Sequence, residues 1–246
     1  MPETVGWEGN PPDSRQVFLQ VISYNLRKNR ASSELLALTE RFTPDILCLQ
    51  ECDTATLPAD LGTLHLADAT MRNRLGLALY YREDRFTAVK TQAFELKKSL
   101  HDRLLKPANE RLIGTRLLDM AEQRELVIAS FHAAPLTALN SLRRQQIATA
   151  HEQLRVLGPG LPTLMVGDYN YPVFKKYLNE RMEDSGYNLT LSDRRTYTRY
   201  KFFRGHFDLA TSLGLSIENV TTLPRGTSDH LPIMVTAAYE SAVLAA

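Results

Sequence analysis

The sequence has few cysteines, no long apolar run and almost no net charge, and each absence narrows the class of protein. Only two of its 246 residues are cysteine. Cys48 and Cys52 stand four positions apart, roughly 13 Å along an extended strand, which is too far for a disulfide. Free thiols in a reducing compartment are therefore expected. No stretch approaches the ~18 apolar residues that span a bilayer, which favours a soluble cytoplasmic protein with no membrane span.

The net charge is +1, so any phosphate-binding surface must be a local patch. Hydrophobic residues make up 43% of the chain, which is typical of a globular protein. Residues 1–16 are polar, contain three prolines and lack the apolar core of a signal peptide. We expect a disordered lead-in over 1–16, a single domain over 17–240 and a C-terminal tail over 241–246.

Apolar runs alternate with helical patterns along most of the chain. Helices are predicted from Ser32 to Arg41, from Leu136 to Leu157 and from Val173 to Met182. Two hairpin regions are predicted, at 75–89 and 112–131. The predicted strands lie at 17–24, 45–51, 75–81, 112–118, 126–132, 163–168, 207–212 and 233–237. This mixture predicts an α/β domain of two packed sheets covered by helices.

A buried strand ends in Gly167-Asp168-Tyr169-Asn170, which places a carboxylate and a carboxamide on one side of the chain. Alone, this pattern is more often an Asx-turn than a functional site. Polar residues also end five other segments: Tyr24-Asn25, Gln50-Glu51, Ser130-Phe131-His132, Asp208 and Ser228-Asp229-His230. Six such groups with compatible chemistry favour one shared site over six unrelated turns.

In this order, the motifs resemble the endonuclease/exonuclease/phosphatase superfamily. The sequence Ala133-Ala134-Pro135 after His132 is most similar to the deoxyribonuclease branch. The resemblance implies an α/β four-layer sandwich, with two mixed or antiparallel sheets flanked by helices. It also implies hydrolysis of a phosphoester with a divalent metal, Mg²⁺ or alternatively Mn²⁺.

Residue chemistry and the resemblance together suggest roles at this site. Glu51 is a hard oxygen ligand for the metal, with Asn25 and Asp229 beside it. His230 is the expected general base, and Asp208 is the carboxylate that the family places against it. The remaining predicted catalytic residues are Asp168 on the water or metal, Asn170 on the phosphoryl group and His132 on the leaving-group side.

Candidate substrate contacts are Arg111, Arg199, Arg204 and Tyr197. Residues 194–204 interleave five basic with four aromatic side chains, which suits a nucleic acid. The alternative is a surface loop whose Thr196-Tyr197 pair packs on the core. Arg111 resembles a phosphate-contacting arginine of deoxyribonuclease-like members, or it is a solvated strand end. Residues 143–146 are predicted to form a solvated helix face, with Gln146 bracing the rim of the site.

The leading hypothesis is a Mg²⁺-dependent phosphodiesterase acting on nucleic acid. One alternative is a phosphatase or phosphodiesterase for inositol phosphates, sphingomyelin or other small or lipid-head phosphoesters. Tyr171-Pro172 stands where inositol phosphatases carry an arginine, which counts against that branch. A catalytically silent binding module is the third hypothesis. No protein partner is implied, a monomer is expected, and His206 is a further titratable group near Asp208.

Overall fold

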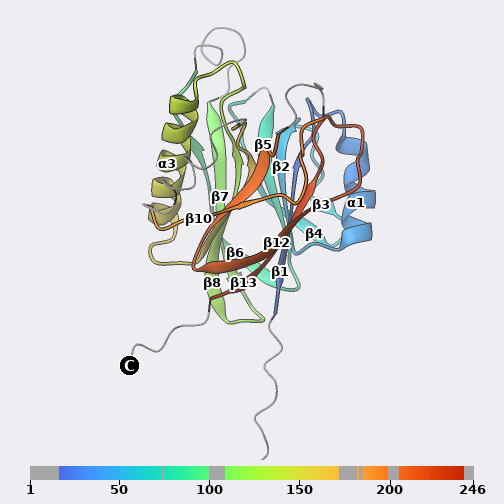
Figure 1. Ribbon diagram of the computed structural model, residues 1–246. Helices are drawn as coiled ribbons and strands as arrows, with labels where there is room; N and C mark the ends of the chain where they lie inside the picture. The colour runs from blue at the N-terminus through green and yellow to red at the C-terminus, as the bar shows by residue number, and fades with distance from the viewer. Residues whose placement is uncertain are drawn as a thin grey trace, which may run out of the picture.

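A computed structural model describes residues 17–73, 75–99, 109–171, 182, 185–198 and 205–240, and two mixed β-sheets form its centre (Figure 1). In the first sheet the strands are β1 (Leu19–Asn25), β2 (Ile46–Cys52), β3 (Asp60–Leu61), β4 (Leu64–Ala69), β5 (Gly76–Arg82), β12 (Leu215–Thr222) and β13 (Ile233–Tyr239). In the second they are β6 (Phe86–Glu95), β7 (Glu110–Asp119), β8 (Arg124–His132), β9 (Thr163–Asp168), β10 (Asn188–Leu191) and β11 (Asp208–Leu213). The spatial orders are β12-β13-β1-β2-β5-β4-β3 and β10-β11-β9-β8-β7-β6.

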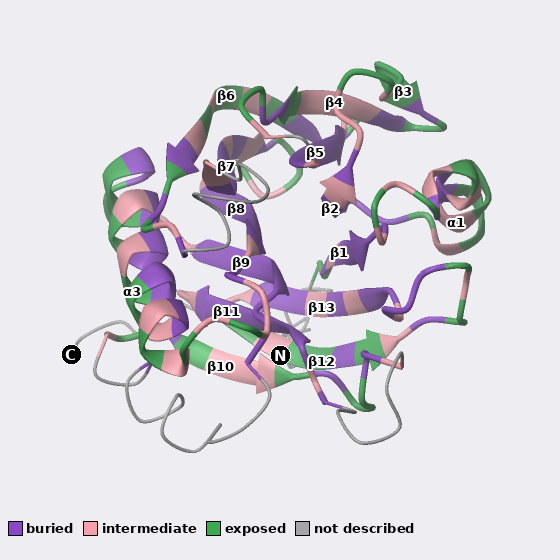
Figure 2. Ribbon diagram, turned by 90° about the horizontal axis from the view of Figure 1, so that it is seen from above, coloured by how far each residue is buried: buried purple, intermediate pink, exposed green. Residues whose placement is uncertain are grey.

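Helices cover the outer faces of both sheets (Figure 2). The short 3-10 helix η1 (Ser32–Glu34) leads into α1 (Leu35–Phe42) beside the first sheet. Helix α3 (Asn140–Leu157) packs on the second. Helix α1 ends where Thr43 adopts a left-handed conformation with φ of 42°, one residue before Pro44. The α/β sandwich expected from the resemblance is confirmed.

The central strands are apolar on both faces because each sheet is covered on both sides. In β1, Val21 packs between the sheets, whereas its neighbour Ile22 packs under α1. In β8, Ile128 points between the sheets and Val127 points toward α3. Each such side chain contributes about 1.5–3 kcal/mol when fully buried. Successive side chains of a strand point to opposite faces, so each continuous apolar run contributes to two layers. The result is three apolar layers: one between the sheets, one under α1 and one under α3.

Two parallel strand pairs bring polar residues to one edge of the sandwich. β1 pairs in parallel with β2, and β8 with β9, so all four strands end on the same side. β11 runs antiparallel to β9 and begins there, with Asp208 opposite Asp168. We call this side the polar edge.

A buried ion network lies at the opposite edge. Arg85 donates to Asp45 at 2.7 Å and to Asp119 at 2.9 Å, and all three side chains are almost fully buried. Asp45 precedes β2 of the first sheet, whereas Asp119 ends β7 of the second. The network therefore ties the two sheets together far from the polar edge.

The strands expected from the sequence are confirmed, with small shifts at their ends, and one expected hairpin is wrong. β5 and β6 do not pair, because the chain crosses from the first sheet to the second at Arg85. The hairpin of β7 and β8 is confirmed. The helix predicted over 173–182 lies outside the described residues except for Met182, and so do 1–16 and 241–246.

Cys48 and Cys52 are buried and form no disulfide. Within the described ranges, no helix has the length and apolar character needed to cross a bilayer.

Candidate active site

Gly167 lets strand β9 approach β8 at the polar edge. Its φ is +148°, and an added Cβ would lie 1.9 Å from the carbonyl oxygen of Phe131. A side chain at this position would separate the two strands, so only glycine allows this pairing. The close pairing places His132 directly opposite Asp168 in the register.

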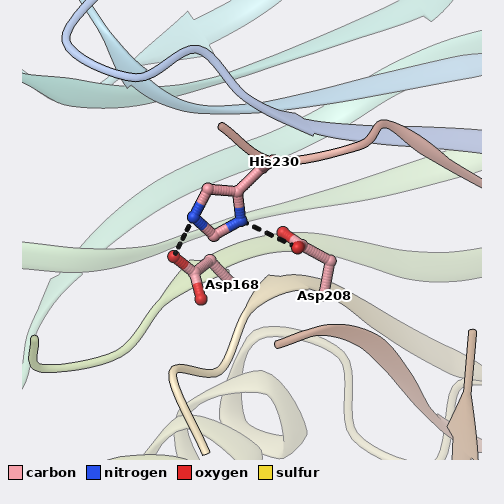
Figure 3. Close-up of side chains that lie close together, drawn as sticks. All are labelled: Asp168, Asp208 and His230. Atoms are coloured by element: carbon pink, nitrogen blue, oxygen red, sulfur yellow. Dashed lines mark hydrogen bonds and ion pairs between the residues drawn. The ribbon is translucent and has the colours of Figure 1, made fainter. Parts of the chain in front are cut away.

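His230 lies between two buried carboxylates (Figure 3). Its Nδ1 is 2.8 Å from Oδ2 of Asp208, and its Nε2 is 3.7 Å from Oδ2 of Asp168. The Oγ1 of Thr196 fixes the start of β11, because it accepts hydrogen bonds from the backbone N–H groups of Phe207 and Asp208. The ring of Tyr197 packs edge-on against His230, with 5.0 Å between ring centroids. The imidazole is therefore held at both nitrogens and on one face.

The two carboxylates determine the charge of His230. Burial alone would lower its pKa, but Asp208 and Asp168 together raise the pKa of His230 to about 10. Burial raises the pKa of Asp168 to about 7, partly offset by His230 and reinforced by Asp208. With these pKa values, His230 is protonated at neutral pH, whereas Asp168 is only partly ionised.

His132 stands on the other side of Asp168. Its Nε2 is 3.7 Å from Oδ2 of Asp168 and 3.9 Å from Oε1 of Glu51. Burial lowers the pKa of His132 to about 4, despite the opposing effect of Glu51. The ring is therefore neutral at neutral pH.

Glu51 reaches the site through an irregularity in β2. Its φ is +54°, and the register between β2 and β5 shifts between Gln50 and Cys52. Such a bulge turns a side chain out of the regular alternation. Oε2 of Glu51 then accepts the backbone N–H of Lys28 at 2.8 Å. Gln50 points between the sheets and donates to the hydroxyl of Ser130 at 2.9 Å.

Asn25 connects this region to the His230 loop. Its Nδ2 donates to Oδ2 of Asp168 at 3.0 Å, and its backbone carbonyl accepts the hydroxyl of Ser228 at 2.7 Å. The same Ser228 oxygen accepts the backbone N–H of His230 at 3.1 Å. Asp229 makes an ion pair with Arg27, with 3.4 Å between Nε and Oδ2.

Asn170 extends the same network. Its backbone N–H donates to Oδ1 of Asp168 at 2.9 Å, and its Nδ2 lies 3.2 Å from Oδ2 of Asp168. Asn170 also has a positive φ of 47°, so the turn that follows β9 holds both groups of the motif together.

The donor chemistry of the polar edge fits a hard divalent cation. Carboxylates with neutral amide oxygens are the ligands that Mg²⁺ and Mn²⁺ prefer. Asp168, Asp208 and His230 offer ligand atoms within 4.8 Å of one another. A metal bound by these three residues would break the bond between His230 and Asp208. The assignment of Glu51, Asn25 and Asp229 as metal ligands stays a prediction. Oδ1 of Asp208 is buried with no hydrogen-bond partner among the described residues.

The predicted substrate contacts lie in different settings. Arg111 is buried, and one of its nitrogens donates to the carbonyls of His132 and Ala133 at 3.0 and 2.9 Å. Tyr197 packs on Phe207 and His230, which confirms that the Thr196-Tyr197 pair packs on the core. Arg199 and Arg204 lie outside the described residues. His206 contacts Ser192, with 3.1 Å between Nδ1 and Oγ.

The sequence reasoning missed Arg143. The solvated face expected over 143–146 is wrong at two positions, because Arg143 is 1% exposed and Gln146 is fully buried. Nε of Arg143 donates to the carbonyl of Ala134 at 3.1 Å, and Oε1 of Gln146 accepts the N–H of Ala134 at 2.8 Å. Arg143 and Gln146 are three residues apart, and Ile147 lies on the same side of the helix. This spacing is the feature of the sequence from which an inward face could have been predicted.

The comparison with known families gives a match to one model. Residues 22–230 match the model described as the Endonuclease/Exonuclease/phosphatase family. Protein angel of Drosophila melanogaster is 27% identical over 163 residues, which are 61% of this chain and 45% of that protein. The match thus spans less than half the length of this relative.

Solved structures share the fold. D. rerio TDP2, solved with a single-strand DNA product, aligns with a TM-score of 0.72 and 14% identity over 92% of this chain and 99% of that one. ANGEL2, described as a 2',3'-cyclic phosphatase and solved with adenosine-2',3'-vanadate, aligns with a TM-score of 0.70 and 15% identity over 93% of this chain and 97% of that one.

Proposed function

The chain belongs to the Endonuclease/Exonuclease/phosphatase family, whose members are phosphoester hydrolases, and we propose that it is a divalent-metal-dependent phosphodiesterase acting on nucleic acid. One observation carries the reaction type: His230 lies between the carboxylates of Asp208 and Asp168, at a buried edge rich in oxygen ligands. Hydrolysis of a phosphoester requires a group that takes a proton from water and groups that stabilise the phosphoryl charge.

Asp168 is suited to orient and deprotonate the attacking water. Its pKa of about 7 leaves it partly ionised at neutral pH, and Asn25 and Asn170 fix its carboxylate. A general base works best when its pKa lies near the working pH. His230, protonated between its two carboxylates, then donates from Nε2 to a phosphoryl oxygen. The general-base role expected for His230 from its residue type stays a prediction, and a pH profile separates the two roles.

His132 and Asn170 complete the proposed set. The neutral ring of His132 offers a hydrogen bond on the leaving-group side, and Arg111 holds the backbone that carries it. The carboxamide of Asn170, which contacts Asp168, would donate to the phosphoryl group. Glu51, Asn25 and Asp229 would hold the cation, which when bound neutralises phosphoryl charge as a Lewis acid.

Two observations support nucleic acid as the substrate class. A structural neighbour was solved with a DNA product and another with an adenosine-based vanadate, and each shares the fold along almost the whole chain. The basic and aromatic residues at 194–204 follow β10 and precede β11, whose first residue, Asp208, belongs to the site. A cytoplasmic location, supported by two free buried thiols, is part of the same proposal.

A hydrolysis panel tests this function. Single-stranded DNA, RNA, plasmid, inositol phosphates and sphingomyelin are each incubated with Mg²⁺, with Mn²⁺ and with a chelator. We expect cleavage of nucleic acid that the chelator abolishes. His230→Ala and Asp168→Asn should each lower kcat by about 10²–10⁴-fold. His65→Ala is the matched control, because His65 is a half-exposed histidine on β4, outside the polar edge.

The pH profile distinguishes the proposed roles. If Asp168 is the base and His230 the donor, kcat rises with pH through the pKa of Asp168 and falls at alkaline pH, as His230 loses its proton. Turnover of only inositol phosphates or sphingomyelin would refute the nucleic-acid proposal. Absence of turnover on every substrate would favour a silent binding module.

A further inference from the structure

A pocket of about 570 Å³ opens beside the start of α3, apart from the His230 site. Its walls include Lys97 and Lys98 after β6, Thr137 and Leu139 from the loop after β8, and Leu142 of α3. No acidic side chain lines it among the described residues. Its volume lies within the range of small-molecule sites.

The pocket is joined rigidly to the catalytic segment. Gln146 donates to the carbonyl of Lys97 at 2.6 Å and accepts the N–H of Ala134 at 2.8 Å, so one buried side chain links the pocket wall to the segment after His132. Arg143 donates to the carbonyl of Ala134 from the same helix. Thr137 is five residues from His132, so at most about 17 Å of chain separates them. A substrate strand held at His132 can therefore reach the pocket.

The lining combines positive charge with apolar surface. Lys97 donates to Gln145 at 2.9 Å, whereas Lys98 makes no hydrogen bond or ion pair with any other described residue. Leu139 is 76% exposed, a large apolar side chain at the pocket rim. A phosphate would be held by the ammonium group, and the flat face of a base would pack on the leucine.

We propose that this pocket binds a second nucleotide of a single-stranded substrate, on the His132 side of the scissile phosphate. The inference rests on the proposed nuclease function and makes it more specific. It assigns the lysine pocket a role in substrate length and affinity, separate from the chemistry at Asp168 and His230. Small phosphodiesters do not extend to it, whereas an oligonucleotide does.

The test compares Lys98→Gln with Lys90→Gln, an exposed lysine on β6 outside the pocket. Kinetics are measured on a short single-stranded oligonucleotide and on bis(p-nitrophenyl) phosphate. We expect Lys98→Gln to raise KM for the oligonucleotide about 5–10-fold without changing kcat. It should also reduce the slope of log KM against log salt by about 0.7, the value for one phosphate contact on a single strand. Turnover of the small diester should be unchanged.

Equal KM values and salt slopes for the two lysine variants would overturn the pocket assignment. A loss of turnover on the small diester by Lys98→Gln would also overturn it, because the lysine would then act on the chemistry. If the protein cleaves no nucleic acid, the proposed function fails, but the pocket is still decided by binding. A fluorescent oligonucleotide that binds Lys98→Gln more weakly than Lys90→Gln supports the pocket, and equal affinity refutes it.

Discussion

Substitution of Gly167 by alanine tests whether the close approach of β8 and β9 builds the site. The added Cβ would lie 1.9 Å from the Phe131 oxygen, whereas real Cβ contacts are essentially never under 3.0 Å. The strands would have to separate by about 1.1 Å at the register pair Phe131–Gly167, next to the pair His132–Asp168. The overlap between residue 167 and Phe131 therefore lies next to two predicted catalytic residues, His132 and Asp168.

The magnitude follows from three costs. The positive φ costs an alanine about 1–2 kcal/mol, overpacking costs about 1–3 kcal/mol, and a weakened strand hydrogen bond about 1 kcal/mol. We expect Gly167→Ala to lower the free energy of unfolding by about 3–6 kcal/mol. Gly160→Ala is the matched control, because its φ is +73° and nothing lies within 4 Å of the added Cβ. It should lose only about 1–2 kcal/mol, the cost of the positive φ alone.

Urea denaturation followed by circular dichroism measures both stabilities, and kcat on a small phosphodiester is measured where both variants are folded. Misplacement by about 1 Å can cost 10²-fold in rate, so the folded Gly167→Ala variant should lose about that factor while Gly160→Ala keeps its activity. If the two variants lose equal stability, or if Gly167→Ala keeps its full kcat, the strand approach does not set the geometry of the site.

Three further perturbations have defined outcomes. His151 is buried against Tyr187, and burial lowers its pKa to about 3, below the unfolded value near 6.5. The neutral ring therefore contributes its full stabilisation to the fold above pH 6.5 and loses it on acidification. His151→Phe should reduce the loss of stability between pH 6.5 and 4 by about 3 kcal/mol, as measured by thermal melts across that range. Arg85→Met should lower the free energy of unfolding by about 3–5 kcal/mol, because it removes the guanidinium that joins the buried carboxylates of Asp45 and Asp119; a loss below about 1 kcal/mol in urea titrations would contradict this. Arg143→Met should lower the free energy of unfolding by about 2–4 kcal/mol, and it should lower kcat more than Arg144→Met does, because Arg143 and not Arg144 donates to the Ala134 carbonyl. Equal effects of the two variants on kcat and on chemical denaturation would refute a role for that hydrogen bond.

The eight strands predicted from the sequence are present because their apolar runs and polar ends are local properties, whereas β3, β4, β10 and β12 were not predicted. Asp168, Asp208, His132 and His230 were predicted from those ends, and they are brought together by the parallel pairing of β8 with β9 and the antiparallel return of β11. Their individual roles stay predictions.

Other features depend on contacts that a local pattern does not encode. The crossing of the chain between the sheets at Arg85 follows from a buried network with Asp45 and Asp119, each more than thirty residues away in sequence. The left-handed conformation of Glu51 shifts the register between β2 and β5, and the residue types around Glu51 do not predict this conformation. Arg143 was misjudged because a charged residue on a helix is usually solvated.

The pairing of β1 with β13 determines where a fused segment can be joined to this fold. Leu19 pairs with Ala237, so both described ends of the chain meet at the edge opposite the polar edge (Figure 1). Strand β1 has seven residues, which places its start about 23 Å from its catalytic end. An affinity tag, reporter or second domain joined to either end would therefore emerge away from the substrate. The same proximity makes the fold a candidate for circular permutation, with a short linker joining the two ends.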